Sequence, residues 1–303
     1  MDLSASKIVL ITGSSSGFGL LTAARLAAKG HHVIATMRDL NKQNALLSEV
    51  NRRGGEVDIL RLDVTDQQMI QEAVSWISSK YGYVDVLVNN AGYGLGGFFE
   101  DLTQEEIRAQ MEVNFFGVQN VTRAVIPLMR QRRRGKIINI SSVAGFSASP
   151  AFSAYNASKW ALEAFSESLR YELKFFGIDV LLIEPGTYKT KIFYENARYA
   201  RYFDHPNSPY YVISQHLKKK VAAYVEDCHK DPEETGAMVE KLIKARNPPF
   251  RNIPDMEGQI LYILRRCLPF RVYSAMIRAF FMKGLNYTPI RSHRNSSKLA
   301  QVR

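Results

Sequence analysis

The sequence contains no apolar stretch long enough to cross a bilayer, and it has very few cysteines. Its longest apolar runs, such as Ile8 to Ile11 and Val180 to Ile183, are only a few residues long, whereas a spanning helix needs about 20. The two cysteines, Cys228 and Cys267, are far apart and match no metal-binding spacing, so we expect no metal site. Free thiols suit a reducing cytoplasm, and Met1 to Lys7 leads directly into a strand pattern, so we expect no cleaved signal peptide.

Acidic residues are nearly absent from the last fifth of the chain. Residues 241–303 contain 13 Lys or Arg and two acids, while residues 1–240 contain 27 of each sign, so the whole net charge of +11 lies in this last part. Two helical apolar patterns occur there, at Ile260 to Leu268 and Val272 to Met282. Such basic helices could lie on an anionic membrane, or they could pack on the domain with their arginines solvated. We expect no nucleic-acid binding, because no recognition motif accompanies the charge, and we expect Arg291 to Arg303 to be a polar disordered end.

The first 190 residues alternate between short apolar runs and helical patterns. Continuously apolar strands that alternate with helices predict a parallel sheet covered on both faces. We therefore predict an α/β fold with a Rossmann-type, doubly wound parallel sheet of about seven strands and a C-terminal helical extension. We place residues 1–303 in a single domain, with a substrate loop at about 187–230 and a basic extension at about 250–303. The predicted strands are Lys7–Thr12, Val33–Thr36, Val57–Leu62, Asp85–Val88, Lys136–Ile140 and Asp179–Ile183, and the later predicted helices are Leu40–Arg53, Asp66–Tyr81, Thr103–Arg130 and Phe152–Phe176.

A glycine-rich turn, Gly13-Ser14-Ser15-Ser16-Gly17-Phe18-Gly19, lies between the first strand and the first helix. Glycines let a phosphate approach the backbone at a helix N-terminus, where unpaired N–H groups favour anions, although a plain strand-to-helix turn has the same composition. The second strand ends in Met37-Arg38 without an acid, and a basic residue at this place binds a 2′-phosphate. NADP(H) is therefore favoured over NAD(H), unless Asp39 pairs with Arg38 on the surface.

Tyr155 and Lys159 lie four residues apart in the helical pattern from Phe152 to Phe176, so they share one helix face. Moving a phenol pKa from ~10 to ~7 requires about 4 kcal/mol of differential interaction. A unit charge at ~4 Å in an effective dielectric of ~20 supplies about that much. The pair is a candidate general acid/base if it faces a pocket, and a solvated helix face if it does not.

The order of these residues resembles the classical short-chain dehydrogenase/reductase family. The resemblance covers residues 7 to about 190 and rests on Thr12-Gly13-xxx-Gly17-x-Gly19, Asp63-Val64, Asn89-Asn90-Ala91-Gly92, Asn114, Ser142, Tyr155-xxx-Lys159 and Pro185-Gly186-xxx-Thr190. It implies an oxidoreductase that acts on CH–OH donors with NAD(P), and a homodimer or homotetramer. Ile183-Glu184-Pro185-Gly186 with Thr190-Lys191 is similar to the steroid and retinol dehydrogenase branch and its bacterial relatives, which implies a hydrophobic alcohol or carbonyl substrate.

The resemblance also implies roles for the matching residues. Tyr155 would exchange a proton with the substrate oxygen, and Lys159 would lower the pKa of Tyr155 and hold the nicotinamide ribose. Ser142 would bond the reacting oxygen, the thirteen-residue interval to Tyr155 selecting it over Ser141, and Asn114 would keep a water for proton relay. The cofactor would be bound by Gly13, Ser15, Ser16, Gly17, Phe18 and Gly19 in the turn, by Arg38, Asp63 and Val64 at the adenosine, by Asn90, Ala91 and Gly92 beside the central strands, and by Tyr155, Lys159, Pro185, Gly186 and Thr190 at the nicotinamide.

The sequence leaves three questions open. Tyr188 stands where the family commonly has a small aliphatic residue, which puts the contact to the carboxamide in doubt. The second hypothesis for function is a non-catalytic NADP-binding scaffold or redox sensor that docks through its basic C-terminal helices. Aromatic residues after Thr190 could line a substrate site or pack a lid onto the domain: Phe193, Tyr194, Tyr199, Tyr202, Phe203, Tyr210 and Tyr211.

Overall fold

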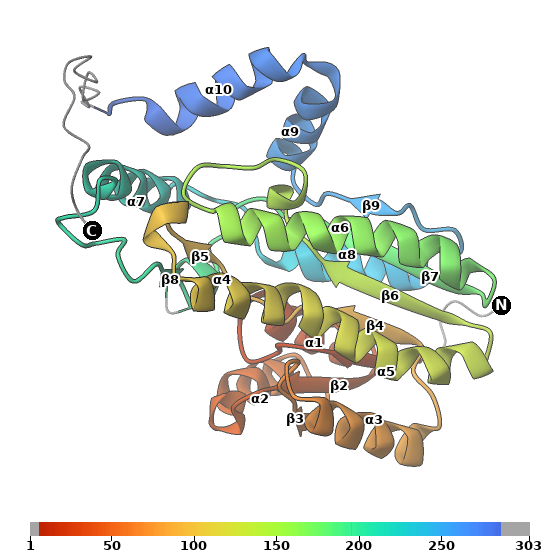
Figure 1. The fold of residues 1–303 in the computed structure, drawn as a ribbon. Helices are drawn as coiled ribbons and strands as arrows, with labels where there is room; N and C mark the ends of the chain where they lie inside the picture. The colour runs from red at the N-terminus through yellow and green to blue at the C-terminus, as the bar shows by residue number, and fades with distance from the viewer. Residues whose placement is uncertain (1–5, 195, 286–303) are drawn as a thin grey trace, which may run out of the picture.

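A seven-stranded parallel sheet forms the centre of the protein (Figure 1). The structure is a computed structural model that describes residues 6–194 and 196–285. The polar disordered end expected for Arg291 to Arg303 lies outside the described residues. All six predicted strands are present, and the sheet confirms the predicted Rossmann-type fold. In spatial order the strands are β3 (Val57–Arg61), β2 (His32–Met37), β1 (Ile8–Ile11), β4 (Val86–Asn89), β6 (Gly135–Ile140), β7 (Ile178–Ile183) and β9 (Arg251–Asn252).

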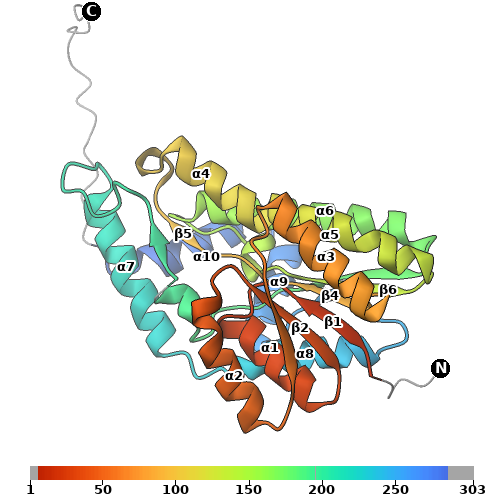
Figure 2. The same cartoon turned by 90° about the horizontal axis from the view of Figure 1, so that it is seen from below.

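Helices cover both faces of this sheet (Figure 2). Alternate residues of β1 enter two separate cores: Val9 and Ile11 pack with the first group of helices, and Ile8 and Leu10 with the second. Because both sides of a strand are buried, its sequence is apolar throughout rather than alternating. The first group is α1 (Gly17–Ala28), α2 (Gln43–Arg52) and α8 (Glu233–Lys244), and the second is α3 (Gln67–Tyr81), α5 (Gly117–Gln131) and α6 (Ser153–Lys174).

The helix predicted for Thr103–Arg130 is present from Gln104 to Gln131, but a π-helical turn, which the sequence pattern did not predict, interrupts its α-helical geometry. A capping box between Thr103 and Glu106 starts α4 (Gln104–Met111), the π turn spans Glu112–Phe116, and α5 follows. Such turns occur frequently at functional sites. This one carries Asn114, whose side chain bonds to the backbone of Tyr93 rather than to its own helix.

The segment predicted as a substrate loop, residues 187–230, contains regular structure. Helix α7 (Tyr211–Glu226) occupies its second half, and β8 (Arg198–Tyr199) pairs with β5 (Leu95–Gly96) in a small second sheet. The seventh strand, β9, pairs with β7 although it lies within the expected extension. Its two residues carry no strand pattern, so the sequence could not reveal it.

The two C-terminal helices exist as predicted and are raised above the sheet in Figure 1. They are α9 (Met256–Cys267) and α10 (Phe270–Met282), with Pro269 between them. The first begins earlier than its apolar pattern does, because the Asp255 side chain accepts a hydrogen bond from Gly258 N and caps it. Within residues 6–194 and 196–285, no helix combines the length and apolarity needed to cross a membrane.

Candidate active site

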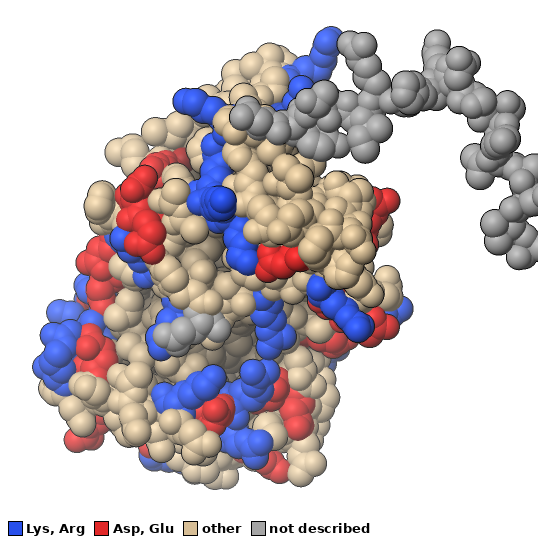
Figure 3. Space-filling model, turned by 90° about the vertical axis from the view of Figure 1, so that its left-hand side faces the viewer, with Lys and Arg blue, Asp and Glu red and all other residues tan. Residues whose placement is uncertain are grey.

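The carboxyl ends of β1, β4, β6 and β7 bring the predicted site residues to one edge of the sheet. Strand order changes direction between β1 and β4, and α/β sheets bind ligands at such a point. Figure 3 views this edge, where the surface is hollowed and Lys and Arg side chains surround the hollow. A basic rim suits an anionic dinucleotide.

The glycine turn is held in place by the end of β4. Gly13 has a φ of +70°, and a Cβ there would lie 2.7 Å from Ala91 Cα, so only glycine fits. Asn90 Nδ2 donates to the carbonyl oxygens of Thr12 and Gly13, both at 3.0 Å. Thr12 Oγ1 accepts from the backbone N–H groups of Asn90 and Ala91, also at 3.0 Å. Thr12 was not among the predicted site residues, although its position before Gly13 was a usable signal.

Among the described residues, no side chain caps the N-terminus of α1 beside this turn. Its N-cap residue, Ser16, makes no side-chain capping bond, whereas Asp66 caps α3 and Thr103 caps α4. A hollow of about 200 Å³ lies against this helix end, between Gly17 and Thr190. Unpaired N–H groups that face an open space fit the phosphates of a dinucleotide.

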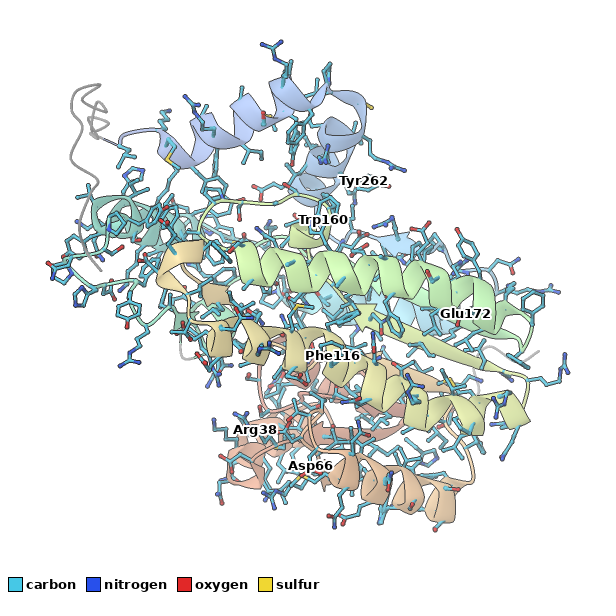
Figure 4. The ribbon with its side chains drawn as sticks, in the orientation of Figure 1. Arg38, Asp66, Phe116, Trp160, Glu172 and Tyr262 are labelled. Atoms are coloured by element: carbon cyan, nitrogen blue, oxygen red, sulfur yellow. The ribbon has the colours of Figure 1, made fainter. Side chains whose placement is uncertain are left out.

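Arg38 lies at the end of β2, at the opposite side of the turn (Figure 4). Its side chain is 65% exposed, and its Nε lies 3.9 Å from Asp63 Oδ2. Asp39 instead accepts from Asn41 N at 3.0 Å, as the N-cap of the following turn. The only acid paired with Arg38 among the described residues is therefore Asp63, which also accepts from the Thr65 hydroxyl. Val64 is buried next to them.

Tyr155 and Lys159 lie on one face of α6, as predicted, and Ser142 approaches them from the end of β6. Lys159 Nζ lies 5.9 Å from the centre of the Tyr155 ring and donates to Ile140 O at 2.9 Å. The pKa of Tyr155 is raised by burial, and a hydrogen bond with Ser142 lowers it in part. This direction is opposite to the expected lowering by Lys159, whose ammonium bonds to Ile140 O in this structure. The neighbouring Ser141 is buried, and its hydroxyl makes no hydrogen bond within the described residues, so the geometry also distinguishes the two serines.

Lys159 is a buried ammonium, 7% exposed. Burial lowers its pKa to about 8, and the nearby Glu163 carboxylate raises it in part. The group is therefore still mostly protonated at pH 7, where it can stabilise negative charge on the Tyr155 oxygen.

Asn114 lies in the π turn and is 1% exposed. Its Oδ1 accepts from Tyr93 N at 3.1 Å, and its Nδ2 donates to Tyr93 O at 3.0 Å and to Ser158 Oγ at 3.2 Å. The side chain thus fixes the backbone that follows Gly92 to the helix that carries Tyr155.

Two buried carboxylates lie behind Lys159 and were not among the predicted site residues. Glu163 follows Lys159 by one helical turn, and Glu184 follows β7; both share Arg251 Nη1, which is 2.6 Å from Glu184 Oε1. Burial raises the pKa of both carboxyls, and Arg251 opposes that rise. The spacing from Lys159 could have revealed Glu163, but nothing in the sequence relates it to Arg251 on β9.

The residues after β7 complete the edge. Val143 N donates to Pro185 O at 3.0 Å, and Gly186 N donates to Asp255 Oδ2 at 2.8 Å. Tyr188 turns away from the hollow: its hydroxyl donates to Glu234 Oε2 at 2.7 Å, and its ring packs edge-on against Phe18. The Tyr188 side chain is therefore not among the residues that line the hollow next to Thr190. Within the part of the chain that the structure describes, no three His, Cys, Asp or Glu residues gather as metal ligands.

Comparisons with known proteins agree over most of the chain. A family model described as short chain dehydrogenase matches residues 7–199. The chain is 38% identical over 276 residues to the 3-ketodihydrosphingosine reductase of Bacteroides thetaiotaomicron, covering 91% of this chain and 98% of that protein. It is 34% identical over 254 residues to the retinol dehydrogenase 8 of Bos taurus, covering 82% and 81%.

Solved structures give the same result. A short-chain dehydrogenase from Streptomyces avermitilis has a TM-score of 0.75 and 32% identity, covering 92% of this chain and 97% of that one. A Burkholderia phymatum protein in complex with NAD has a TM-score of 0.77 and 25% identity, with coverages of 88% and 95%. A metagenomic oxidoreductase in complex with NADP has a TM-score of 0.65 and 28% identity, with coverages of 82% and 97%.

Proposed function

Because this chain belongs to the short-chain dehydrogenase/reductase family, we propose that it transfers hydride between NADP(H) and an alcohol or carbonyl group of a hydrophobic substrate. Membership makes it an oxidoreductase with a nicotinamide cofactor, which sets aside the non-catalytic scaffold. The observation that carries the proposal is the position of Tyr155: it shares a helix face with a buried ammonium and lies within reach of Ser142 at the edge of the sheet.

The proposed chemistry divides between the chain and the cofactor. The nicotinamide, when bound, supplies or accepts the hydride. In reduction the Tyr155 hydroxyl gives its proton to the carbonyl oxygen, which Ser142 holds by a hydrogen bond. Lys159 stabilises the phenolate that remains, and it also holds the nicotinamide ribose. In oxidation the same phenolate takes the proton from the alcohol.

Cofactor binding follows from the same edge. The proposal assigns the phosphates to the backbone between Gly13 and Gly19, with Ser15, Ser16 and Phe18 in the turn. Asp63 and Val64 flank the adenine, Asn90, Ala91 and Gly92 line the centre, and Pro185, Gly186 and Thr190 meet the nicotinamide. Arg38 favours NADP(H), because it is exposed at the strand end while Asp39 caps its own turn. NAD(H) is the alternative, and the solved relatives include a complex with each.

A hydrophobic substrate is supported by two relatives, one named for a sphingoid ketone and one for retinol. We also propose a homodimer or homotetramer formed through α4, α5 and α6. Phe116 and Trp160 on this side are 41% and 42% exposed, and both are labelled in Figure 4. The proposed location is the cytoplasm, where Cys228 and Cys267 stay free thiols.

The test is a fluorescence titration of the purified protein with NADPH and NADH. The expected result is tighter binding of NADPH, and a loss of about tenfold in NADPH affinity in Arg38→Ala with NADH unaffected. Arg123→Ala, on the exposed side of α5, is the matched control and should change neither. Equal binding of both cofactors would contradict the NADP(H) assignment, and binding of neither would contradict the proposed function.

A further inference from the structure

An apolar stripe on α9 faces away from the protein. Met256, Ile260, Ile263 and Cys267 follow one another at intervals of four, three and four residues, so they lie along one side of the helix. Met256 is 72% exposed, Ile260 50% and Ile263 57%, and Cys267 is exposed as well. A surface helix normally turns its apolar stripe toward the core. Here the stripe has no partner within the described chain.

The helix is held in this orientation by its other side. Asp255 caps it and also accepts from Gly186 N at 2.8 Å. The ring of Tyr262 packs edge-on against Phe146, with the ring centres 5.1 Å apart (Figure 4). On α10, the Tyr273 hydroxyl bonds to Ser147. These contacts fix the orientation of α9, and they leave its apolar stripe exposed.

The apolar surface continues at the corner between the two helices, where α10 begins. Phe270 is 66% exposed and Val272 is 53% exposed. No acidic residue occurs between positions 258 and 285. This stretch contains five cations. Arg265 and Arg266 lie over the rings of Tyr273 and Tyr262 on the docked side, whereas Arg271, Arg278 and Lys283 line an open hollow along α10.

We propose that the docking surface formed by Met256, Ile260, Ile263, Phe270 and Val272, with Arg271, Arg278 and Lys283 of the second helix and its end, binds an anionic membrane surface. Interfacial binding has two contributions. Apolar side chains enter the headgroup region, and cations are attracted to the lipid phosphates. A second copy of this chain fits less well, because pairing the two surfaces would bring their arginines together, and the exposed acid of α9, Glu257, is already paired with Lys230.

Membrane docking at this surface would bring the active-site edge close to the lipid. Phe146 and Ser147, which contact Tyr262 and Tyr273, follow Ser142 in the same short segment. If the proposed function holds, an apolar substrate could pass between the bilayer and the site without crossing water. This consequence rests on the proposed function, but the docking itself does not.

The test is co-sedimentation of the full chain with vesicles of phosphatidylcholine alone and of phosphatidylcholine with phosphatidylglycerol. The expected result is binding to the anionic vesicles that weakens with salt. Replacing Ile260 and Ile263 by Glu together should raise the lipid concentration for half-maximal binding by more than about tenfold. Ile260→Ser with Ile263→Ser serves if the acidic variant folds poorly.

The matched control is Phe175→Glu, which places an acid on another exposed apolar side chain, 79% exposed after α6. It should bind vesicles as the parent does. Equal binding by the Ile260/Ile263 variants, or an equal loss in the control, would overturn the proposal. The proposal would also be overturned if the parent protein did not bind vesicles but self-associated, and if the Ile260/Ile263 variants abolished that self-association. NADPH titration of every variant separates failure of docking from failure of the proposed function, because docking variants should bind NADPH normally.

Discussion

The glycine turn and the α9–α10 pair are attached to the same protein in different ways. The turn is fixed by backbone: Gly13 meets Ala91 at a distance that admits no side chain, and Asn90 bonds two of its carbonyl groups. The helix pair is held mainly by side chains, those of Asp255, Tyr262 and Tyr273. Backbone contacts leave little freedom of position, whereas a few side-chain contacts can be exchanged. The proposed cofactor site thus lies on the region that is fixed by backbone contacts. The proposed membrane-docking surface lies on the region that is held by side chains.

The largest expected effect comes from breaking the rigid region. Gly13→Ala puts a Cβ against Ala91 in a left-handed conformation, so we expect a loss of about 3 kcal/mol in the free energy of unfolding and loss of NADPH binding. Gly82→Ala is the matched control, because its φ is +78° but nothing lies within 4 Å of the added atom. It should cost only about 1 kcal/mol. Urea unfolding measures both, and equal losses would show that close approach does not fix the turn.

An intermediate effect is expected from releasing the helix pair. Asp255→Ala removes the acceptor of Gly186 N, Gly258 N and Lys230 Nζ, which should cost about 2 kcal/mol. Limited proteolysis should then cut the chain before α9 faster, while the sheet stays intact. Asp66→Ala, which removes the cap of α3, is the control and should not speed this cleavage. An unchanged rate in Asp255→Ala would mean that other contacts hold α9.

At pH values near 4.5 the smallest effect is expected between the two regions, where Glu163 and Glu184 share Arg251 from β9 and the free energy of unfolding should depend on pH up to about pH 8. Burial raises the pKa of Glu184 above its ordinary 4.5, so the folded state binds a proton that the unfolded state releases. Stability should therefore fall as pH rises above that ordinary value. Glu184→Gln should reduce this slope by at most about 1.4 kcal/mol per pH unit. The exposed Glu172→Gln should leave it unchanged, and an unchanged slope in Glu184→Gln would mean that the carboxyl is ionised throughout.

Much of the fold was predictable because its signals are local. The central strands are apolar on both sides, and Tyr155 and Lys159 are four residues apart on one helix. The π turn at Asn114 was not predictable, since it depends on a bond to Tyr93 in another segment. Strand β9 was missed because its two residues pair with β7 only after a long intervening stretch.

The α9 stripe shows a different limit. Its spacing predicts an amphipathic helix, but periodicity does not say whether the apolar side meets the core or the outside. That choice depends on which residues the rest of the fold presents to the helix, such as Phe146 opposite Tyr262. For the same reason the sequence could not relate Glu163 to Arg251.

Tyr155 is proposed as the proton donor of a nicotinamide-dependent reduction. This role is tested most directly by following NADPH oxidation with a panel of apolar ketones and aldehydes in the parent protein, Tyr155→Phe and Tyr171→Phe. Tyr171 is the matched control, since it lies on the same helix and is 65% exposed. We expect a fall of about a thousandfold in kcat for Tyr155→Phe while NADPH still binds, and no change for Tyr171→Phe. Turnover by Tyr155→Phe at the parent rate would contradict this role.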